Sequence, residues 1–506
     1  MLSTGSATLF QNFNTTKPSK PISIMNRTFI SALAAMMLCI PALAENSQET
    51  SPAEGSNLEQ QEEKKAKKNV TYNENGEIIK TGLNFGPLPV VAFDADRGFQ
   101  YGALLNIYNF GDGKNYPNPN STWYIEASAY TGGTWNLYLN YDNKQIFDNV
   151  RLSVCTKYAN EAALDFYGFN GYQSNYVFGD DNFLKDNPDF SRYDDTEKGQ
   201  KLENKFINKG KFPKGFYRYS RQSFVGKADF IGDITDNFKW EAGYSFYWVN
   251  NQSFTPKGYT VEDGSLYDLY KDWGIINPTE KPNQFFSAIK AGLLYDSRNV
   301  ENNPTKGIWA EAHAILGPKW LGSSQEAYKI SATWRQYVPL GTEKLVLAYR
   351  LAYQGFLGKN TPWYMMPYYS NMGDKRDFDA IGGYRTVRGI MLDRVQGVHT
   401  GFYNIELRYR FVDFQLFNQN IAFALSGFTD GAHVFKGYDL TNKTGVKQDL
   451  YKKYIDTSRK DGLHASAGGG LRFIMNQNFI VAFEYARCFN KQDGNGAFYI
   501  NTGFLF

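Results

Sequence analysis

The segment "GFYNIELRYRF" at residues 401–411 alternates regularly between apolar and polar side chains. One face carries Tyr403, Ile405, Leu407, Tyr409 and Phe411, and the other carries Asn404, Glu406, Arg408 and Arg410. The segment "QFFSAIKAGLLYDSR" at 284–298 repeats the pattern, with Phe285, Ile289, Leu293 and Tyr295 opposite Lys290 and Asp296. A period of two, with one apolar and one charged face, is the signature of a β-strand.

The composition narrows the class of protein to which these strands belong. The chain has 506 residues, of which 17% are aromatic, a high share for a soluble globular protein. The mean hydropathy of −0.49 argues against a bundle of membrane-spanning helices. The net charge is only +3, and basic stretches such as "EEKKAKK" at 62–68 contain acidic residues as well, so nucleic acid is a poor candidate partner.

The N-terminal region predicts export from the cytoplasm. The apolar run "FISALAAMMLCIPALA" at 29–44 follows Arg27 and ends in the small-x-small triplet 42–44. This is typical of a secretory signal peptide within residues 1–44, cleaved after Ala44, with Met25 as the expected natural start. Because the run is short for a membrane span, an N-terminal anchor is the less favoured interpretation. Cys39 has Leu38 before it, so we do not expect a lipoprotein.

Residues 45–78 are rich in Glu, Gln, Ser, Asn and Lys and predict a disordered periplasmic spacer. From residue 79 to residue 506 the alternating texture predicts a single all-β domain. For an exported chain this favours an antiparallel transmembrane β-barrel, with lipid outside and polar residues inside. A soluble β-sandwich is the alternative, but its interior faces rarely carry Arg and Glu in register.

Sixteen segments show this alternation, and an even number is what a single-chain bacterial barrel requires. We expect strands at 88–95, 98–110, 121–131, 134–143, 149–161, 215–231, 236–251, 283–297, 306–317, 325–338, 343–357, 400–412, 419–436, 461–474, 478–489 and 496–506. The long connections then fall on one side, as expected for external loops. They lie near 162–214, 252–282, 358–399 and 437–460.

The last segment, "GAFYINTGFLF", predicts a strand with Phe498, Ile500, Phe504 and Phe506 on the lipid face. A terminal strand that closes on an aromatic residue resembles the sorting signal of outer-membrane barrels. The sequence therefore predicts a barrel in the outer membrane of a Gram-negative bacterium. Strand parity places Cys155 and Cys488 on inward faces, and leaves open whether they pair.

The stretch "GGYRTVRGIMLDRVQG" at 382–397 lies in the external connection between the eleventh and twelfth segments. Its Val387-Arg388-Gly389-Ile390 resembles the V-R-G-[FY] hallmark of the BamA/TamA superfamily of outer-membrane insertases and two-partner secretion translocators, and departs from it only at Ile390. In that superfamily the hallmark loop folds back into the barrel lumen. The resemblance thus implies a sixteen-stranded barrel with an external loop inserted into its lumen.

Further motifs extend this resemblance over most of residues 86–506. Asp296, Arg298, Pro304 and Gly307 resemble a D-x-R and P-x-x-G periplasmic turn. The segments "NIELRY" (404–409), "FTDGAHVF" (428–435) and "ASAGGGLRF" (465–473), together with Gly503, are similar to family strands. Two departures are the position of Gly431, one place early after Asp430, and "FYGFNG" at 166–171 in place of F-[FY]-G-x-G-N.

Arg388 can also be interpreted from its chemistry. A guanidinium that enters a narrow lumen loses water, which is costly unless carboxylates replace it, and its planar fork suits two-point pairing. Strand parity turns Glu406 and Asp430 inward, and the family pattern has acidic partners of the arginine there. The alternative is a solvated loop arginine. Gly382, Gly383 and Gly389 would supply the bends of the loop.

The resemblance implies a barrel that assists insertion or export of proteins or lipids, acting on client proteins. Known relatives carry periplasmic POTRA domains, for which residues 45–78 leave no room, so a periplasmic or surface partner protein would replace them. A weak seam between the first and last strands is a hypothesis, based on Pro87, Pro89, Gly503 and Phe506. Ordinary strand-start prolines are the alternative.

Other functions remain open alternatives. A sixteen-stranded barrel is wide enough for a passive channel, and the large loop at 162–214 could make the chain a surface interaction platform. We expect no enzyme and no cofactor, because the sequence has no G-x-S-x-G elbow. We also expect no metal site, because His313, His399, His433 and His464 have no metal-ligand spacing. His433 is interpreted as structural.

Overall fold

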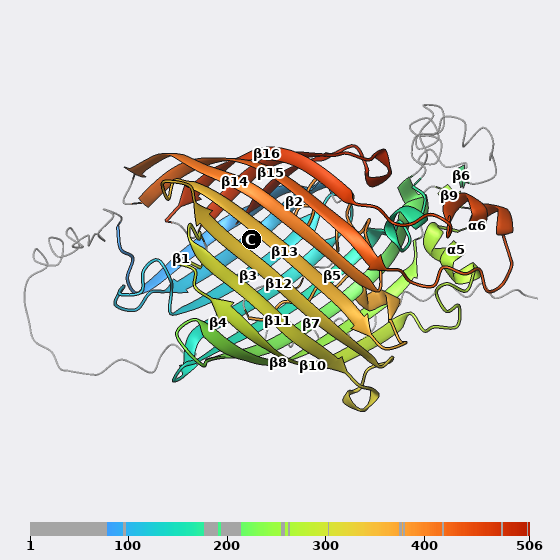
Figure 1. The fold of residues 1–506 in the computed structure, drawn as a ribbon, viewed down its shortest axis with the longest axis horizontal. Helices are drawn as coiled ribbons and strands as arrows, with labels where there is room; N and C mark the ends of the chain where they lie inside the picture. The colour runs from blue at the N-terminus through green and yellow to red at the C-terminus, as the bar shows by residue number, and fades with distance from the viewer. Residues whose placement is uncertain are drawn as a thin grey trace, which may run out of the picture. The chain divides into compact units, whose positions relative to one another are not determined.

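Sixteen strands form a closed antiparallel barrel in the described part of the chain (Figure 1). The structure is a computed structural model that describes residues 78–94, 98–176, 191–193, 214–254, 259–261, 264–301, 303–373, 377, 380–416, 419–476, 479–502 and 504–506. The predicted fold class is confirmed. The predicted signal peptide (1–44), the spacer up to residue 77, the question of POTRA domains and Gly503 lie outside the described residues.

The barrel strands follow one another around the wall in chain order. They are β1 (Leu83–Asp94), β2 (Gly98–Asn109), β3 (Ser121–Tyr130), β4 (Trp135–Phe147), β5 (Val150–Asp165), β7 (Arg218–Asp233), β8 (Phe238–Ser253), β10 (Asn283–Asp296), β11 (Gly307–Gly317), β12 (Ala327–Pro339), β13 (Leu345–Leu357), β14 (His399–Leu416), β15 (Gln419–Lys436), β16 (His464–Met475), β17 (Phe479–Cys488) and β18 (Ala497–Thr502).

Short elements occupy the connections, and several of them gather beyond one end of the barrel (Figure 1). They are the paired strands β6 (Ser191–Tyr193) and β9 (Tyr259–Val261), the helices α5 (Leu266–Asp272) and α6 (Gln448–Tyr454), and the 3-10 turns η2 (Gly171–Gln173), η3 (Lys214–Tyr217), η4 (Lys319–Leu321), η5 (Trp363–Met365) and η6 (Lys491–Asp493). None of the described helices has the length and apolar character needed to cross a membrane.

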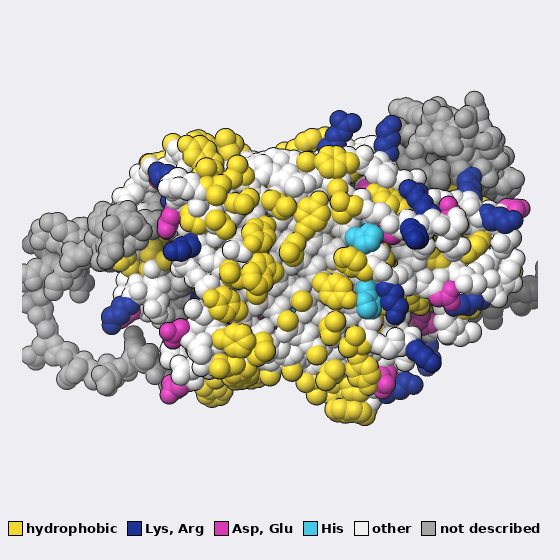
Figure 2. Space-filling model, in the orientation of Figure 1, with side chains coloured by type: hydrophobic (Ala, Val, Ile, Leu, Met, Phe, Trp, Pro, Cys, Tyr) yellow, Lys and Arg dark blue, Asp and Glu magenta, His cyan; other side chains and the backbone are white. Residues whose placement is uncertain are grey.

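Strand β14 shows how the alternation becomes two faces. Ile405 and Leu407 are 43% and 44% exposed on the outside, whereas Asn404 and Glu406 between them are fully buried inside. Hydrophobic side chains cover the middle of the barrel wall, and Lys, Arg, Asp and Glu gather toward its two ends (Figure 2). An apolar band flanked by charges is the surface that a lipid bilayer requires.

The connections divide by length between the two ends. The described residues 166–176, 214–217, 264–282, 380–398 and 437–463 belong to long connections at one end, and the short connections 148–149 and 234–237 lie at the other. By the rule for outer-membrane barrels, the first end is external and the second is periplasmic. Most of the 162–214 stretch considered as an interaction surface falls outside the described residues.

The external connections pack into a cap with its own hydrophobic core. Side chains from four separate connections are at most 5% exposed within it, among them Phe166, Tyr270, Trp363 and Tyr454. The ring of Phe166 meets that of Tyr270 edge-on, with centroids 5.1 Å apart. These aromatic contacts hold the loops together over the external end.

The wall is weakest where the first strand meets the last. All 12 residues of β1 pair with β2, but the register between β1 and β18 is limited to Phe93 opposite Ile500. Pro87 and Pro89 lie inside β1, opposite Leu105 and Ala103, and not at its start as expected. Because Pro87 and Pro89 are two positions apart, the N–H groups that they lack would both point to the same side of β1. Proline is tolerated in a strand when that side has no hydrogen-bonding partner.

The end of the chain corrects one prediction. Phe498 is 42% exposed on the outside, but Phe504 and Phe506 do not lie on the lipid face. Strand β18 ends at Thr502, and Phe506 packs with Tyr337, Val346 and Ala348 against the inner wall. Phe504 packs on inward-facing side chains of β15, β16 and β17 in the same way.

Inward-facing arginines explain this turn. The guanidinium of Arg408 lies 4.3 Å from the ring centroid of Phe504 and 5.0 Å from that of Phe506. Arg408 also donates to the main-chain oxygen of Phe506 at 3.1 Å, and Arg350 donates to that of Leu505 at 3.3 Å. Cation–π contacts and hydrogen bonds thus favour the lumen over the lipid face. Period two alone could not reveal these contacts.

The two described cysteines answer the question that the sequence left open. Cys155 and Cys488 are both buried, and neither forms a disulfide. The thiol of Cys155 donates to the hydroxyl of Tyr138 at 3.3 Å, and that of Cys488 donates to the carbonyl of Gly494 at 2.7 Å. Each thiol therefore has its own partner, and no disulfide links them.

A charge on the outer face should destabilise the barrel. We expect Leu407→Arg to lower the free energy of unfolding in a bilayer by about 2–4 kcal/mol, because the cation enters hydrocarbon. Leu463→Arg, at an exposed site in the external connection 437–463, is the matched control and should have little effect. Urea unfolding of the barrel refolded into lipid vesicles measures both variants. Equal unfolding midpoints would contradict the assignment of this face to lipid.

Candidate functional site: the lumen loop of Arg388

The connection between β13 and β14 turns back into the barrel. Val387, Arg388 and Ile390 are at most 1% exposed, so the whole motif is buried. Gly382 and Gly389 have φ angles of +115° and +85°, which favour glycine. A Cβ on Gly382 would lie 2.0 Å from the carbonyl oxygen of Met391, so this bend also requires a residue without a side chain.

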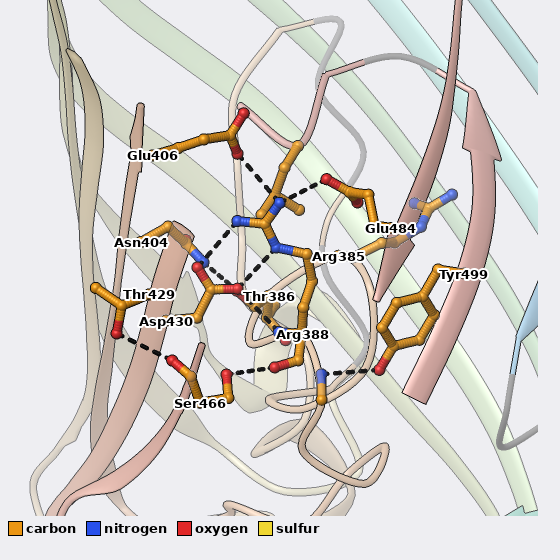
Figure 3. Close-up of polar contacts among 12 residues, drawn as sticks. Arg385, Thr386, Arg388, Asn404, Glu406, Thr429, Asp430, Ser466, Glu484 and Tyr499 are labelled. Carbon is orange, nitrogen blue, oxygen red and sulfur yellow. Dashed lines mark hydrogen bonds and ion pairs between the residues drawn. The ribbon is translucent and has the colours of Figure 1, made fainter. Parts of the chain in front are cut away.

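Arg388 is bound at both edges of its guanidinium (Figure 3). On one edge Nε and Nη2 donate to the two carboxylate oxygens of Asp430 on β15, at 2.8 and 3.0 Å. On the other edge Nη1 donates to Glu484 on β17 at 2.7 Å and to Glu406 on β14 at 3.1 Å. The main-chain N–H of Arg388 also donates to Asp430, at 3.0 Å. Three strands therefore hold one side chain.

Two further arginines balance the charge of these carboxylates. Arg472 on β16 lies 2.8 Å from Glu406 and 2.7 Å from Glu484, and Arg408 donates to Glu406 at 3.0 Å. Within this cluster three guanidiniums thus face three carboxylates. Because all six groups are buried, the loss of one partner would leave an uncompensated charge.

An aromatic ring lies against the face of the same guanidinium. The central carbon of Arg388 is 3.4 Å from the ring centroid of Phe428 on β15. The hydrogen bonds use the edge of the planar group and the ring covers its face, which a lysine ammonium could not reproduce.

The loop also contacts β16 and β18, on the side of the barrel that leads to the seam. The N–H of Gly389 donates to the hydroxyl of Tyr499 on β18 at 3.0 Å, and Ser466 on β16 donates to the carbonyl oxygen of Arg388 (Figure 3). Together with its carboxylate partners, the motif contacts every strand from β14 to β18. It braces the closing strands of the barrel from inside.

The second half of the loop is anchored in the external cap. Arg394 is fully buried and donates to the main-chain oxygens of Gly171, Ser174 and Gln492, at 2.9–3.1 Å. The N–H of Asn170, in the departing "FYGFNG" motif, donates to the carbonyl oxygen of Gln396 at 2.7 Å. The segment 166–171, although it departs from the family motif, therefore contacts the lumen loop.

The loop start is held by polar groups of β13 and β14. The carbonyl oxygen of Thr386 accepts hydrogen bonds from Asn404 at 2.7 Å and Arg350 at 3.4 Å. Arg350 also donates to the carbonyl of Arg385 and to the side chain of Asn404. The same Arg350 contacts Leu505, so the loop and the end of the chain share one partner.

The predicted periplasmic turn motif forms a compact structure between β10 and β11. Arg298 pairs with both carboxylate oxygens of Asp296, each at 2.8 Å. Gly307 has a φ of +108°, and a Cβ there would lie 2.2 Å from the carbonyl oxygen of Ser297. Pro304 is buried in the same turn. Glu301 extends from it to Lys144 of β4, at 2.5 Å.

The structure brings together Arg388, Glu406 and Asp430, and places the turn motif and the seam prolines elsewhere in the barrel. Sequence reasoning missed Glu484 and Arg472. Glu484 and Cys488 lie an even number of positions apart in β17, so they face the same side. Strand parity predicts an inward Cys488 and could therefore have predicted an inward Glu484 as well. His433 points outward from β15, 35% exposed, as expected from its parity relative to Asp430.

The arrangement is suited to holding a loop. All three nitrogens of the Arg388 guanidinium donate hydrogen bonds, and this cationic centre has three anionic partners. Such a buried network acts as a clamp whose release would free the loop and the strands it contacts.

Arg388→Ala should loosen this clamp. We expect the barrel to lose about 3–5 kcal/mol of unfolding free energy, because three buried carboxylates would face only Arg408 and Arg472. Arg388→Lys should recover only part of this loss. Heat-modifiability on gels and protease cleavage within 380–398 measure stability and loop release.

Arg385→Ala is the matched control, because Arg385 lies in the same loop, is only half-buried and donates from its side chain to Tyr384. It should behave as the wild type does in both measurements. If Arg388→Ala and Arg385→Ala were equally resistant to heat and protease, the clamp would be refuted.

Comparison with known proteins adds a family match. A model of the Omp85 superfamily domain matches residues 149–506. Among solved structures, BamA from Haemophilus ducreyi lacking POTRA domains 1-3 is 16% identical with a TM-score of 0.48, over 86% of this chain and 74% of that one. CdiB from Acinetobacter baumannii is 14% identical with a TM-score of 0.43, over 85% and 61%. No curated protein matches the chain.

Proposed function

Because this chain belongs to the Omp85 superfamily, we propose that its barrel inserts or exports proteins or lipids at the outer membrane of a Gram-negative bacterium. Its surroundings are outer-membrane lipid, and its clients are membrane or exported proteins. A periplasmic or surface partner would deliver the clients. The signal peptide is removed near Ala44. No cofactor and no covalent chemistry are part of the proposal.

The short β1–β18 seam is the observation that carries this proposal. Backbone N–H and C=O groups left unpaired in hydrocarbon are costly, so a wall with one aligned pair at this junction separates at lower cost than the β1–β2 junction. An exposed strand edge pairs readily with another strand. A client strand could add to β1 or β18 in this way.

The lumen loop supports the same proposal. Arg388 and Gly389 hold β14 to β18 together from inside, so the loop sets how freely β18 moves. Pro87 and Pro89 reduce pairing on the β1 side, and the inward turn after Thr502 shortens β18. Both strands of the seam, β1 and β18, therefore have fewer backbone partners across it than neighbouring strands have at the other junctions.

A passive channel and a surface interaction platform are the alternative functions. The buried loop from Val387 to Ile390 argues against a channel, because it fills the lumen at the level of β14 to β17. One feature of the external cap supports the interaction platform, which is that its loops pack together into one surface.

Locking the seam tests the mechanism. Phe93→Cys with Ile500→Cys, in a background without Cys155 and Cys488, places two thiols at opposed positions within disulfide reach. We expect oxidation to stop client insertion or export and reduction to restore it. Val91→Cys with Tyr101→Cys, opposed across β1–β2, is the control lock and should leave function intact. Equal activity of the two oxidised barrels would rule out an opening seam.

Depleting the protein tests the function itself. We expect quantitative proteomics and lipid analysis of washed outer membranes to show loss of a defined set of barrels, surface proteins or lipids. Arg388→Ala at normal abundance should reproduce this loss. Unchanged protein and lipid inventories with altered uptake of small solutes would replace the proposal by a channel. Unchanged uptake as well, with lost surface binding, would favour the platform.

A further inference from the structure

Three metal-ligating side chains meet inside the barrel, away from Arg388. They are Glu241 on β8 and Glu311 and His313 on β11, and each is at most 4% exposed. One potential ligand atom from each lies within 4.8 Å of the others. In the strand order of the barrel, β8, β10 and β11 form the wall opposite the seam.

The strand register explains why residues so far apart in sequence meet. Gly292 on β10 lies between the two partner strands, opposite Glu241 on one side and His313 on the other. A Cβ on Gly292 would lie 2.4 Å from the Cβ of His313. Because position 292 has no side chain, groups from β8 and β11 can approach each other across β10.

The cluster has unused ligand atoms. Both carboxylate oxygens of Glu241 are buried without a hydrogen-bond partner, and so is Nε2 of His313. Nδ1 of His313 lies 3.0 Å from Glu311, in a geometry that makes no hydrogen bond. A buried carboxylate without a partner is costly, so these atoms point to a missing cation.

Nearby cations do not fill this role. Lys290 pairs with Asp229 at 2.7 Å. Lys227 lies 3.7 Å from Asp229 and 3.6 Å from Asp377. These two lysines and two aspartates balance each other. Among the described residues, Glu311 lies 3.0 Å from the imidazole of His313, and neither carboxylate oxygen of Glu241 has a hydrogen-bond partner.

We propose that Glu241, Glu311 and His313 bind one divalent transition-metal ion of the Zn²⁺ or Mn²⁺ class. Two carboxylates neutralise its charge, and an imidazole suits these ions better than Mg²⁺ or Ca²⁺. Three protein ligands leave a further position for water. The N–H of Met372 donates to Glu311 at 3.2 Å and orients that carboxylate, as outer-shell partners of metal ligands do.

A cavity gives the ion a route to the cluster. It has a volume of about 120 Å³, and Glu241 lines it together with Asp296, Arg298 and Glu301 of the periplasmic turn. The ion would therefore enter from the periplasmic end. Once bound, it would tie β8 to β11 and stiffen the wall opposite the seam.

Metal content of the purified barrel tests this site. The full chain is refolded in detergent, stripped with a chelator, equilibrated with Zn²⁺ or Mn²⁺ and desalted before elemental analysis. We expect about one ion per chain in the wild type, and a fall of at least about tenfold in Glu241→Gln and in His313→Gln. Glu126→Gln, a lumen carboxylate on β3, and His399→Gln are the matched controls and should keep the ion.

A second readout remains informative if a variant fails to fold. Added Zn²⁺ or Mn²⁺ should raise the melting temperature of the stripped wild-type barrel, because a ligand bound only by the folded state stabilises it. Co²⁺ should give the visible absorption bands of a protein-bound ion. Absence of retained ion and of any thermal shift in the wild type would overturn the site. Equal metal content in the wild type and both ligand variants would also overturn it.

Discussion

The structure depends on one constraint, which is that backbone N–H and C=O groups inside a bilayer must find partners within the protein. Closure of the sixteen strands gives hydrogen-bond partners to the backbone of almost the whole wall. The alternation of each strand then separates lipid-facing from lumen-facing side chains. The same constraint makes the β1–β18 junction important for function. Phe93 and Ile500 are its aligned pair, so the described backbone has the fewest partners in the wall at this junction.

Closure creates a second problem, since the lumen is narrow and many inward side chains are charged. The chain solves it with local charge balance. Arg388, Arg408 and Arg472 face Glu406, Asp430 and Glu484 at one level, and Lys227 and Lys290 face Asp229 and Asp377 at another. Among the described residues, both carboxylate oxygens of Glu241 lack a hydrogen-bond partner, which is the basis for inferring a metal ion there. Buried charge thus explains both the clamp and the further site.

Much of this was accessible from the sequence. Period two located all sixteen barrel strands, and parity turned Glu406 and Asp430 inward. The errors fell where strands end. Phe504 and Phe506 follow the alternation of β18 in sequence, but the chain leaves the sheet after Thr502 and packs on inward arginines. The sequence pattern predicts that the first strand starts near Pro87, whereas β1 begins at Leu83. Local pattern cannot tell how far a ladder continues.

The sequence by itself determined the barrel and its two faces, because both follow from local alternation, and the resemblance of Val387-Arg388-Gly389 to a family motif implied the lumen loop. Only the tertiary structure decided which charges meet. Glu484 joins Arg388, and Glu241 joins His313 across Gly292, because register between distant strands sets these contacts. The extent of the seam is likewise a property of the closed wall. Pairing across the closure depends on strand tilt and stagger, which no single segment specifies.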